Sequence, residues 1–102
     1  MTSRNSGHRL LNIKFSKLAN QDLSSIHNYI KHDQPQAAQA IIHRIIEAVE
    51  ILVKFPSLGR PGRVSHTREL VLSNTPFLII YQVRQNSLYI VRILHAAQKW
   101  GK

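Results

Sequence analysis

Three apolar runs between Arg68 and His95 constrain the fold of this chain more than any other feature. The runs are RELVLSN, PFLIIYQV and LYIVRILH, and the polar segments Asn74-Thr75-Pro76 and Arg84-Gln85-Asn86-Ser87 separate them. Runs rich in Ile, Val, Leu and Tyr with short polar turns between them are typical of consecutive antiparallel strands. The middle run, residues 77–83, is apolar at six of its seven positions, which favours a central strand or one covered on both faces. The sequence therefore predicts a three-stranded meander.

The N-terminal half of the chain indicates one strand and two helices. Residues 11–15 alternate apolar and polar side chains, which predicts a short half-buried strand, and Ser16 can cap the helix that follows. Apolar residues recur at helical spacing from Lys17 to about Lys31, and again from Pro35 to about Lys54. We therefore expect an α+β fold, in which an N-terminal strand precedes a two-helix antiparallel hairpin packed on an antiparallel sheet that ends in the meander.

Length and composition limit the class of protein. A chain of 102 residues suits one domain with a modest core, which we place at residues 11–102, after a flexible polar lead-in at residues 1–10. The chain has no cysteine, which excludes a disulfide framework, a thiolate metal site and a cysteine nucleophile. Its apolar stretches are far shorter than the ~20 residues that span a bilayer, so we expect a soluble, cytoplasmic protein with no membrane partner.

The charge of the chain predicts an anionic partner. Fourteen Lys and Arg residues against five Asp and Glu give a formal net charge of +9, and such a field favours nucleic acid, ribosomes or an acidic protein. Basic residues are densest around the turn-rich segment FPSLGRPGR, which contains Arg60 and Arg63 and is followed by Arg68. This group can be a contact surface, because loops often carry contacts, or a solvated basic loop.

Two polar residues at the end of the last run are further candidates. His95 can act as an acid or base because its ordinary pKa lies near neutrality, or it can be a hydrogen-bonded structural residue. Arg92 should share a strand face with Ile90 and Leu94 and lie opposite His95, unless the strand bulges. Arg92 then either contacts a partner or forms an internal ion pair with Glu69.

The remaining candidates give weaker signals. Trp100 can anchor a partner through its large area, or cover the edge of the helix hairpin. His27 and His32 are five residues apart, which misses a common helical face, so we expect no metal. A Gly-rich phosphate loop and a Ser-His-Asp arrangement are both missing from the sequence. We therefore expect no cofactor.

Five stretches between Phe15 and Trp100 resemble the RelE/ParE superfamily of bacterial toxins, and the ParE branch most closely. The stretches are DLSSIHNYI, FPSLGRPGRV, RELVL, FLIIYQV and IVRILHAAQKW. They follow the order and spacing of the family over about five-sixths of the chain. The resemblance implies the toxin of a type II toxin–antitoxin module, neutralised by a cognate antitoxin. A dimer and a toxin–antitoxin hetero-oligomer both remain open.

The superfamily holds two activities, and the residues favour one of them. RelE-like members cut messenger RNA in the ribosomal A site, whereas ParE-like members poison DNA gyrase. Cleavage of RNA needs a base, an acid and cations that hold the developing phosphorane charge. RelE-like toxins commonly place cations in the middle strand and just after the last strand, but the corresponding positions here are Leu78 and Ala96 or Ala97. The resemblance therefore implies binding to gyrase.

The two activities assign different residues. As a gyrase inhibitor, the chain would contact gyrase or its DNA through Arg60, Arg63 and Arg68, with Arg92, His95 and Trp100 as a second set. The alternative is a ribosome-dependent mRNA endonuclease with the ribosome and its message as partners. Its catalytic residues would be His95, Arg92, Arg68, Glu69 and His66, with Arg63 beside them.

Overall fold

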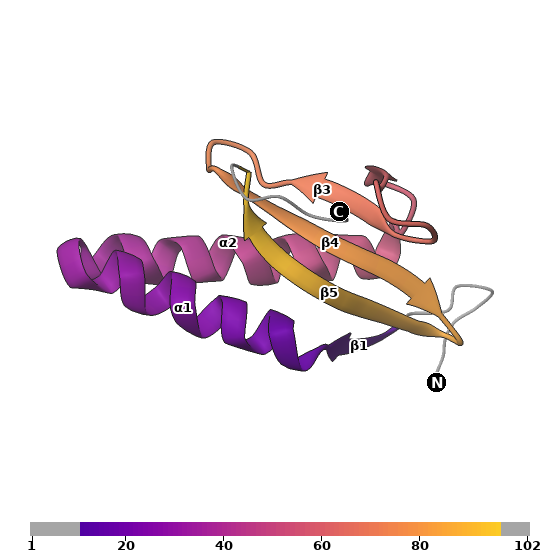
Figure 1. The fold of residues 1–102 in the computed structure, drawn as a ribbon, viewed down its shortest axis with the longest axis horizontal. Coiled ribbons are helices and arrows are strands. Elements are labelled where there is room, and N and C mark those ends of the chain that lie inside the picture. Colours follow the sequence, from indigo (N-terminus) through magenta and orange to yellow (C-terminus); the bar gives the residue numbers. More distant parts are fainter. Residues whose placement is uncertain (1–10, 97–102) are drawn as a thin grey trace, which may run out of the picture.

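The expected α+β fold is confirmed. The computed structural model describes residues 11–96, so the predicted lead-in at residues 1–10 lies outside the described residues. Its elements are strand β1 (Asn12–Phe15), helices α1 (Lys17–Asp33) and α2 (Pro35–Lys54), and strands β2 (Arg60–Pro61), β3 (Arg68–Val71), β4 (Phe77–Arg84) and β5 (Ser87–His95). The two helices form a hairpin that packs on one face of the sheet (Figure 1).

The sheet has the order β1-β5-β4-β3-β2, with β4 at its centre as predicted. Strands β3, β4 and β5 form the expected antiparallel meander. The two-residue strand β2, which the sequence did not indicate, pairs antiparallel with β3. Strand β1 pairs parallel with β5, so the sheet is mixed where we expected an antiparallel one. The connection from β1 to β5 runs through the helix hairpin and the other three strands. Parallel neighbours need such a long connection, because a tight turn joins only antiparallel strands.

Apolar side chains gather on both faces of the sheet. The main core lies between the helices and the sheet, and its fully buried members include Ile45, Leu52, Ile79, Tyr81, Leu88 and Ile90. A second, smaller cluster on the opposite face, which we call the outer face, comprises Leu78, Ile80 and Leu94, with Val91 against it. Strand β4 is thus covered on both faces, which explains its nearly continuous apolar run.

Strand β5 contains a bulge at Val91. Tyr81 pairs with Ile90 whereas the adjacent Ile80 pairs with Arg92, so Val91 is an extra residue in β5. The bulge turns Ile90 toward the helices and Arg92 toward the outer face. The predicted common face of Ile90 and Arg92 is therefore wrong, because a bulge breaks the two-residue alternation of an ideal strand.

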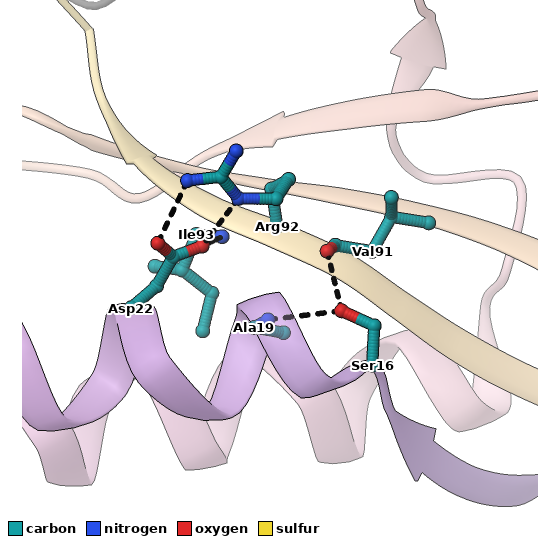
Figure 2. Close-up of polar contacts among 6 residues, drawn as sticks. All are labelled: Ser16, Ala19, Asp22, Val91, Arg92 and Ile93. Carbon is teal, nitrogen blue, oxygen red and sulfur yellow. Dashed lines mark hydrogen bonds and ion pairs between the residues drawn. The ribbon is translucent and has the colours of Figure 1, made fainter.

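Helix α1 covers the part of β5 that β1 does not reach. Strand β1 pairs with β5 only as far as Ile90, and an unpaired strand edge exposes backbone donors and acceptors. Figure 2 shows how side chains from α1 and its cap meet this edge. The Ser16 hydroxyl donates to the Val91 carbonyl at 2.7 Å, and the Ile93 N–H donates to the Asp22 carboxylate at 2.9 Å. These side chains take the place of a neighbouring strand.

Ser16 also begins α1, as predicted. Its hydroxyl oxygen accepts a hydrogen bond from the Ala19 N–H at 2.9 Å (Figure 2). One side chain thus satisfies an orphan donor of the helix and a carbonyl on the edge of β5.

Replacement of Ser16 by Ala should remove both bonds at once. We expect the Ser16→Ala variant to lose about 1–2 kcal/mol of unfolding free energy, measured by urea denaturation followed by circular dichroism. The control is Ser24→Ala, because Ser24 is exposed in the middle of α1 and Ala there should be neutral or slightly stabilising. Equal unfolding free energies for the two variants would contradict the double role of Ser16.

Candidate functional site

The candidate site is the basic loop, residues 55–67, together with Arg68 at the start of β3. Tyr81, fully buried in β4, fixes the first part of this loop. Its hydroxyl donates to the Pro56 carbonyl at 2.7 Å and accepts from the Gly59 N–H at 2.8 Å. Burial raises the pKa of the Tyr81 phenol, although the Gly59 hydrogen bond and the charge of Arg68 lower it. The phenol therefore stays neutral and can both donate and accept.

Close packing against Tyr81 explains the glycine at position 59. A Cβ atom on Gly59 would lie 2.6 Å from the Tyr81 hydroxyl oxygen and 2.8 Å from a carbon of its ring. Any larger residue would push the loop away from β4 and break the two hydrogen bonds of the phenol. The path of the basic loop therefore depends on this glycine.

The carboxylate of Glu69 organises the two exposed arginines of the loop. Its side chain is only 2% exposed, and it accepts from Arg60 Nη2 at 3.2 Å and from the Arg63 backbone N–H at 3.1 Å. The Arg63 Nε atom lies 3.7 Å from the same carboxylate. A buried carboxylate requires such partners. The Arg60 and Arg63 side chains nevertheless remain 62% and 55% exposed, so their guanidinium groups stay open to a partner.

Arg68 differs from the other two arginines. Its Nη1 atom donates to the Gly59 carbonyl at 2.6 Å and to the Ser57 carbonyl at 3.4 Å. Arg68 pairs across the sheet with Pro61, so the structure brings the three predicted arginines together. Arg68 thus stabilises the loop through its backbone carbonyls, whereas Arg60 and Arg63 are the exposed cations of the loop.

Arg92 forms an ion pair with Asp22 of α1, which the sequence analysis did not identify (Figure 2). The Arg92 Nε and Nη2 atoms donate to the two carboxylate oxygens at 2.8 and 2.9 Å. These bonds raise the pKa of the Arg92 guanidinium, whereas its partial burial lowers it. The expected alternative of an Arg92–Glu69 pair is wrong, because Glu69 is held by the basic loop. Asp22 is the only acidic residue in the first four turns of α1, a signal that could have marked it.

The two candidate histidines lie at separate places. His95 is exposed at the end of β5, where its ring meets the edge of the Phe77 ring with centroids 5.7 Å apart. His95 pairs with Phe77 and Arg92 pairs with Ile80, so the two lie on opposite faces, as expected. The bulge precedes Arg92 and does not bring them together. His66 is exposed in the turn before β3, with a left-handed backbone φ of 68°.

The residues that a nuclease would need are therefore dispersed. Arg68 pairs with Tyr81 and His95 pairs with Phe77, and four residues along a strand correspond to roughly 13 Å. Glu69 and Arg92 are each held by an internal ion pair. Leu78 is buried in the outer cluster and Ala96 is exposed. The candidates Ala97 and Trp100 lie outside the described residues.

Within residues 11–96, no three His, Asp or Glu side chains gather closely enough to hold a metal ion. Among the helices of that part of the chain, none is long and apolar enough to cross a membrane.

Comparison with known proteins gives the family of the chain. The sequence model described as "ParE toxin of type II toxin-antitoxin system, parDE" matches residues 13–100. The chain belongs to this ParE toxin family. It is 40% identical over 88 residues to the protein Y4kP of Sinorhizobium fredii, and the aligned residues cover 86% of this chain and 91% of that protein. It is also 39% identical over 77 residues to Toxin RelE2 of Caulobacter vibrioides, covering 76% and 85% of the two chains.

Solved structures agree with membership of the ParE family. A chain of the chromosomal ParDE TA system from P. aeruginosa superposes with a TM-score of 0.76 at 28% identity, covering 84% of this chain and 96% of that one. A chain of the E. coli DinJ–YafQ toxin–antitoxin complex superposes with a TM-score of 0.56 at 16% identity, covering 92% and 99%. The second likeness shows a common fold alone.

The Asp22–Arg92 pair makes a testable contribution to the stability of this ParE-family protein. Asp22→Ala leaves the Arg92 guanidinium and the Ile93 N–H without their acceptor, and should lower the unfolding free energy by about 2–4 kcal/mol. Asp22→Asn keeps an acceptor for the Ile93 N–H but loses the charge. Its unfolding free energy should therefore lie between those of Asp22→Ala and the natural chain. Gln21→Ala, at an exposed neighbouring position, is the control for urea denaturation. A loss no larger than that of the control would contradict the account of this edge.

Proposed function

We propose that this ParE-family toxin inhibits bacterial growth in the cytoplasm by binding DNA gyrase, and that it acts by binding without catalysis. The supporting observation is the preformed basic loop, in which Arg60 and Arg63 are anchored on a buried carboxylate yet remain more than half exposed. Guanidinium groups held in place lose less side-chain entropy on binding than free ones. The loop thus offers two fixed positive charges to gyrase or to the DNA that gyrase holds.

A cognate antitoxin is the second proposed partner. Membership of a toxin–antitoxin family supports it, and the net charge of +9 favours an acidic or mixed antitoxin segment with apolar anchors. Apolar side chains available to such a segment are exposed at Ile51, Phe55, Leu58 and Val71. Ile51, Leu58 and Val71 line one cleft between α2 and β3. We propose that the antitoxin covers the helix hairpin and part of the sheet.

Ribosome-dependent cleavage of mRNA is the alternative function. The name of the relative Toxin RelE2 favours it. Against it stands the dispersal of the candidate catalytic residues, since a phosphorane needs several cations at one place. Here Arg92 is neutralised by Asp22, Arg68 binds loop carbonyls, and Leu78 occupies the strand position at which RelE-like toxins commonly carry a cation.

Induction of the chain without its antitoxin separates the two functions. We expect growth arrest accompanied by chromosomal DNA breaks and the SOS response, because a gyrase poison leaves cleaved DNA. Cleavage of ribosome-bound messages should be measured in the same cells by mapping RNA ends. Prompt message cleavage without DNA damage would reject the gyrase proposal in favour of the endonuclease.

The same assay tests the basic loop. Removal of Arg60 and Arg63 alone would leave Glu69 buried without a cation, so we use the triple variant Arg60→Ala/Arg63→Ala/Glu69→Gln. This variant should lose toxicity while it still binds antitoxin. The matched control Glu69→Gln keeps both guanidinium groups and an amide oxygen that can accept from Arg60 or the Arg63 N–H, and should remain toxic. Full toxicity of the triple variant at equal soluble protein level would remove the loop from the contact with gyrase.

A further inference from the structure

A second group of basic side chains lies on the outer face of the sheet, on strands β1, β5 and β4. It comprises Lys14 of β1, Tyr89 of β5 and Gln82 and Arg84 of β4, and we call it the outer basic face. Lys14 pairs with Tyr89, and Tyr89 pairs with Gln82. Arg84 is two residues from Gln82 and therefore shares its strand face. The alternate residues Phe15, Ile90 and Tyr81 pack in the core beneath the helices, so this surface faces the other way.

Arg84 is fixed on this face without losing its charge. Its guanidinium carbon lies 5.3 Å from the centroid of the Tyr89 ring, and its Nη1 atom donates to Gln82 Oε1 at 3.1 Å. Both partners are neutral, and within residues 11–96 Arg84 contacts no carboxylate. A guanidinium stacked on a ring keeps most of its N–H donors free at its edge. Arg84 is therefore positioned to bind an anion.

Lys14 adds a second charge, and none of the acidic side chains that the structure describes offsets it. Lys14 is exposed, and its side chain forms no hydrogen bond or ion pair in the part of the chain that the structure describes. Glu69 of β3 and Asp22, which accepts from the edge of β5, are both engaged with arginines. Glu47 and Glu50 belong to α2, on the opposite side of the sheet. Within the described side chains, the positive charge of the outer basic face is thus uncompensated.

The chemistry of this face fits phosphate groups better than a protein surface. Strands are about 4.8 Å apart, so Lys14 and Arg84 approach from strands roughly 10 Å apart and can reach different phosphates of one backbone. Two exposed apolar residues lie nearby, Ile13 and Val83. Both pair with Leu88, which is buried in the main core, so they lie on the face of the sheet that packs against the helices. Among the described residues, the outer basic face itself therefore presents no exposed apolar side chain of the kind that protein partners bury.

We propose that the outer basic face binds the phosphate backbone of duplex DNA, independently of sequence and of gyrase. Proteins that bind single strands usually stack bases on aromatic rings. Here the Arg84 guanidinium occupies one face of the Tyr89 ring, so that face is not available to stack a base and the cationic groups favour a paired duplex. Backbone contacts of this kind are strongly salt-dependent because they release counterions.

Fluorescence anisotropy with a labelled 20-base-pair duplex tests this site on the full 102-residue chain, freed of antitoxin. The variant Lys14→Ala/Arg84→Ala should bind about tenfold more weakly, and the slope of log affinity against log salt should fall by about 1.8. The control Lys31→Ala/Lys54→Ala removes the same charge from exposed positions in the last turns of α1 and α2 and should change affinity by less than about twofold.

Substitutions of Tyr89 change no charge, so they test whether the position of the Arg84 guanidinium matters in addition to its charge. Tyr89→Leu should weaken duplex binding about threefold because Arg84 loses the ring that positions it, whereas Tyr89→Phe should bind like the natural chain. Equal affinities for the two double variants would overturn the proposal. So would tighter binding of single-stranded RNA of the same length, or displacement of the duplex by poly-glutamate at equal charge concentration. The assay contains no gyrase, so its failure leaves the gyrase proposal intact.

Discussion

The contact on which this fold most depends is the carboxylate of Asp22 against the uncovered edge of β5. One side chain accepts hydrogen bonds from Arg92 Nε, Arg92 Nη2 and the Ile93 N–H. It lies where β1 ends and the bulge at Val91 begins, so it replaces a missing strand with a helix side chain. Because Ser16 meets the same edge nearly two turns earlier, the start of α1 and the end of β5 form one connected unit. Strand β5 can therefore extend as far as His95.

A similar arrangement holds the basic loop. Tyr81 and Glu69, both buried in the sheet, supply the hydroxyl and the carboxylate that fix a segment rich in proline and glycine. These internal pairs occupy Asp22 and Glu69, while Arg60, Arg63, Arg84 and Lys14 retain exposed charge. The acidic and basic residues of the sheet and the loop thus have different roles. Carboxylates hold the scaffold, and the excess of cations remains available to anionic partners.

Sequence periodicity predicted the elements well and their long-range relations poorly. The helices, the Ser16 cap and the meander depend on local patterns, and the structure has them within about two residues of their expected ends. The parallel direction of β1, the strand β2 and the bulge at Val91 depend on pairing between distant segments, which leaves no local signature. The partner of Arg92 was missed for the same reason, since Asp22 is 70 residues away. Arg84 was assigned to a turn, although β4 extends through it and stacks it on Tyr89.

We propose that this ParE-family chain acts by binding gyrase through a preformed basic loop. The most direct measurement adds the purified full-length chain to DNA gyrase and supercoiled plasmid, and follows linear DNA after detergent and protease treatment. We expect cleaved plasmid to accumulate with the natural chain and with Glu69→Gln, but not with Arg60→Ala/Arg63→Ala/Glu69→Gln. Unchanged supercoiling and no cleaved plasmid at a large molar excess of the natural chain would contradict the proposal.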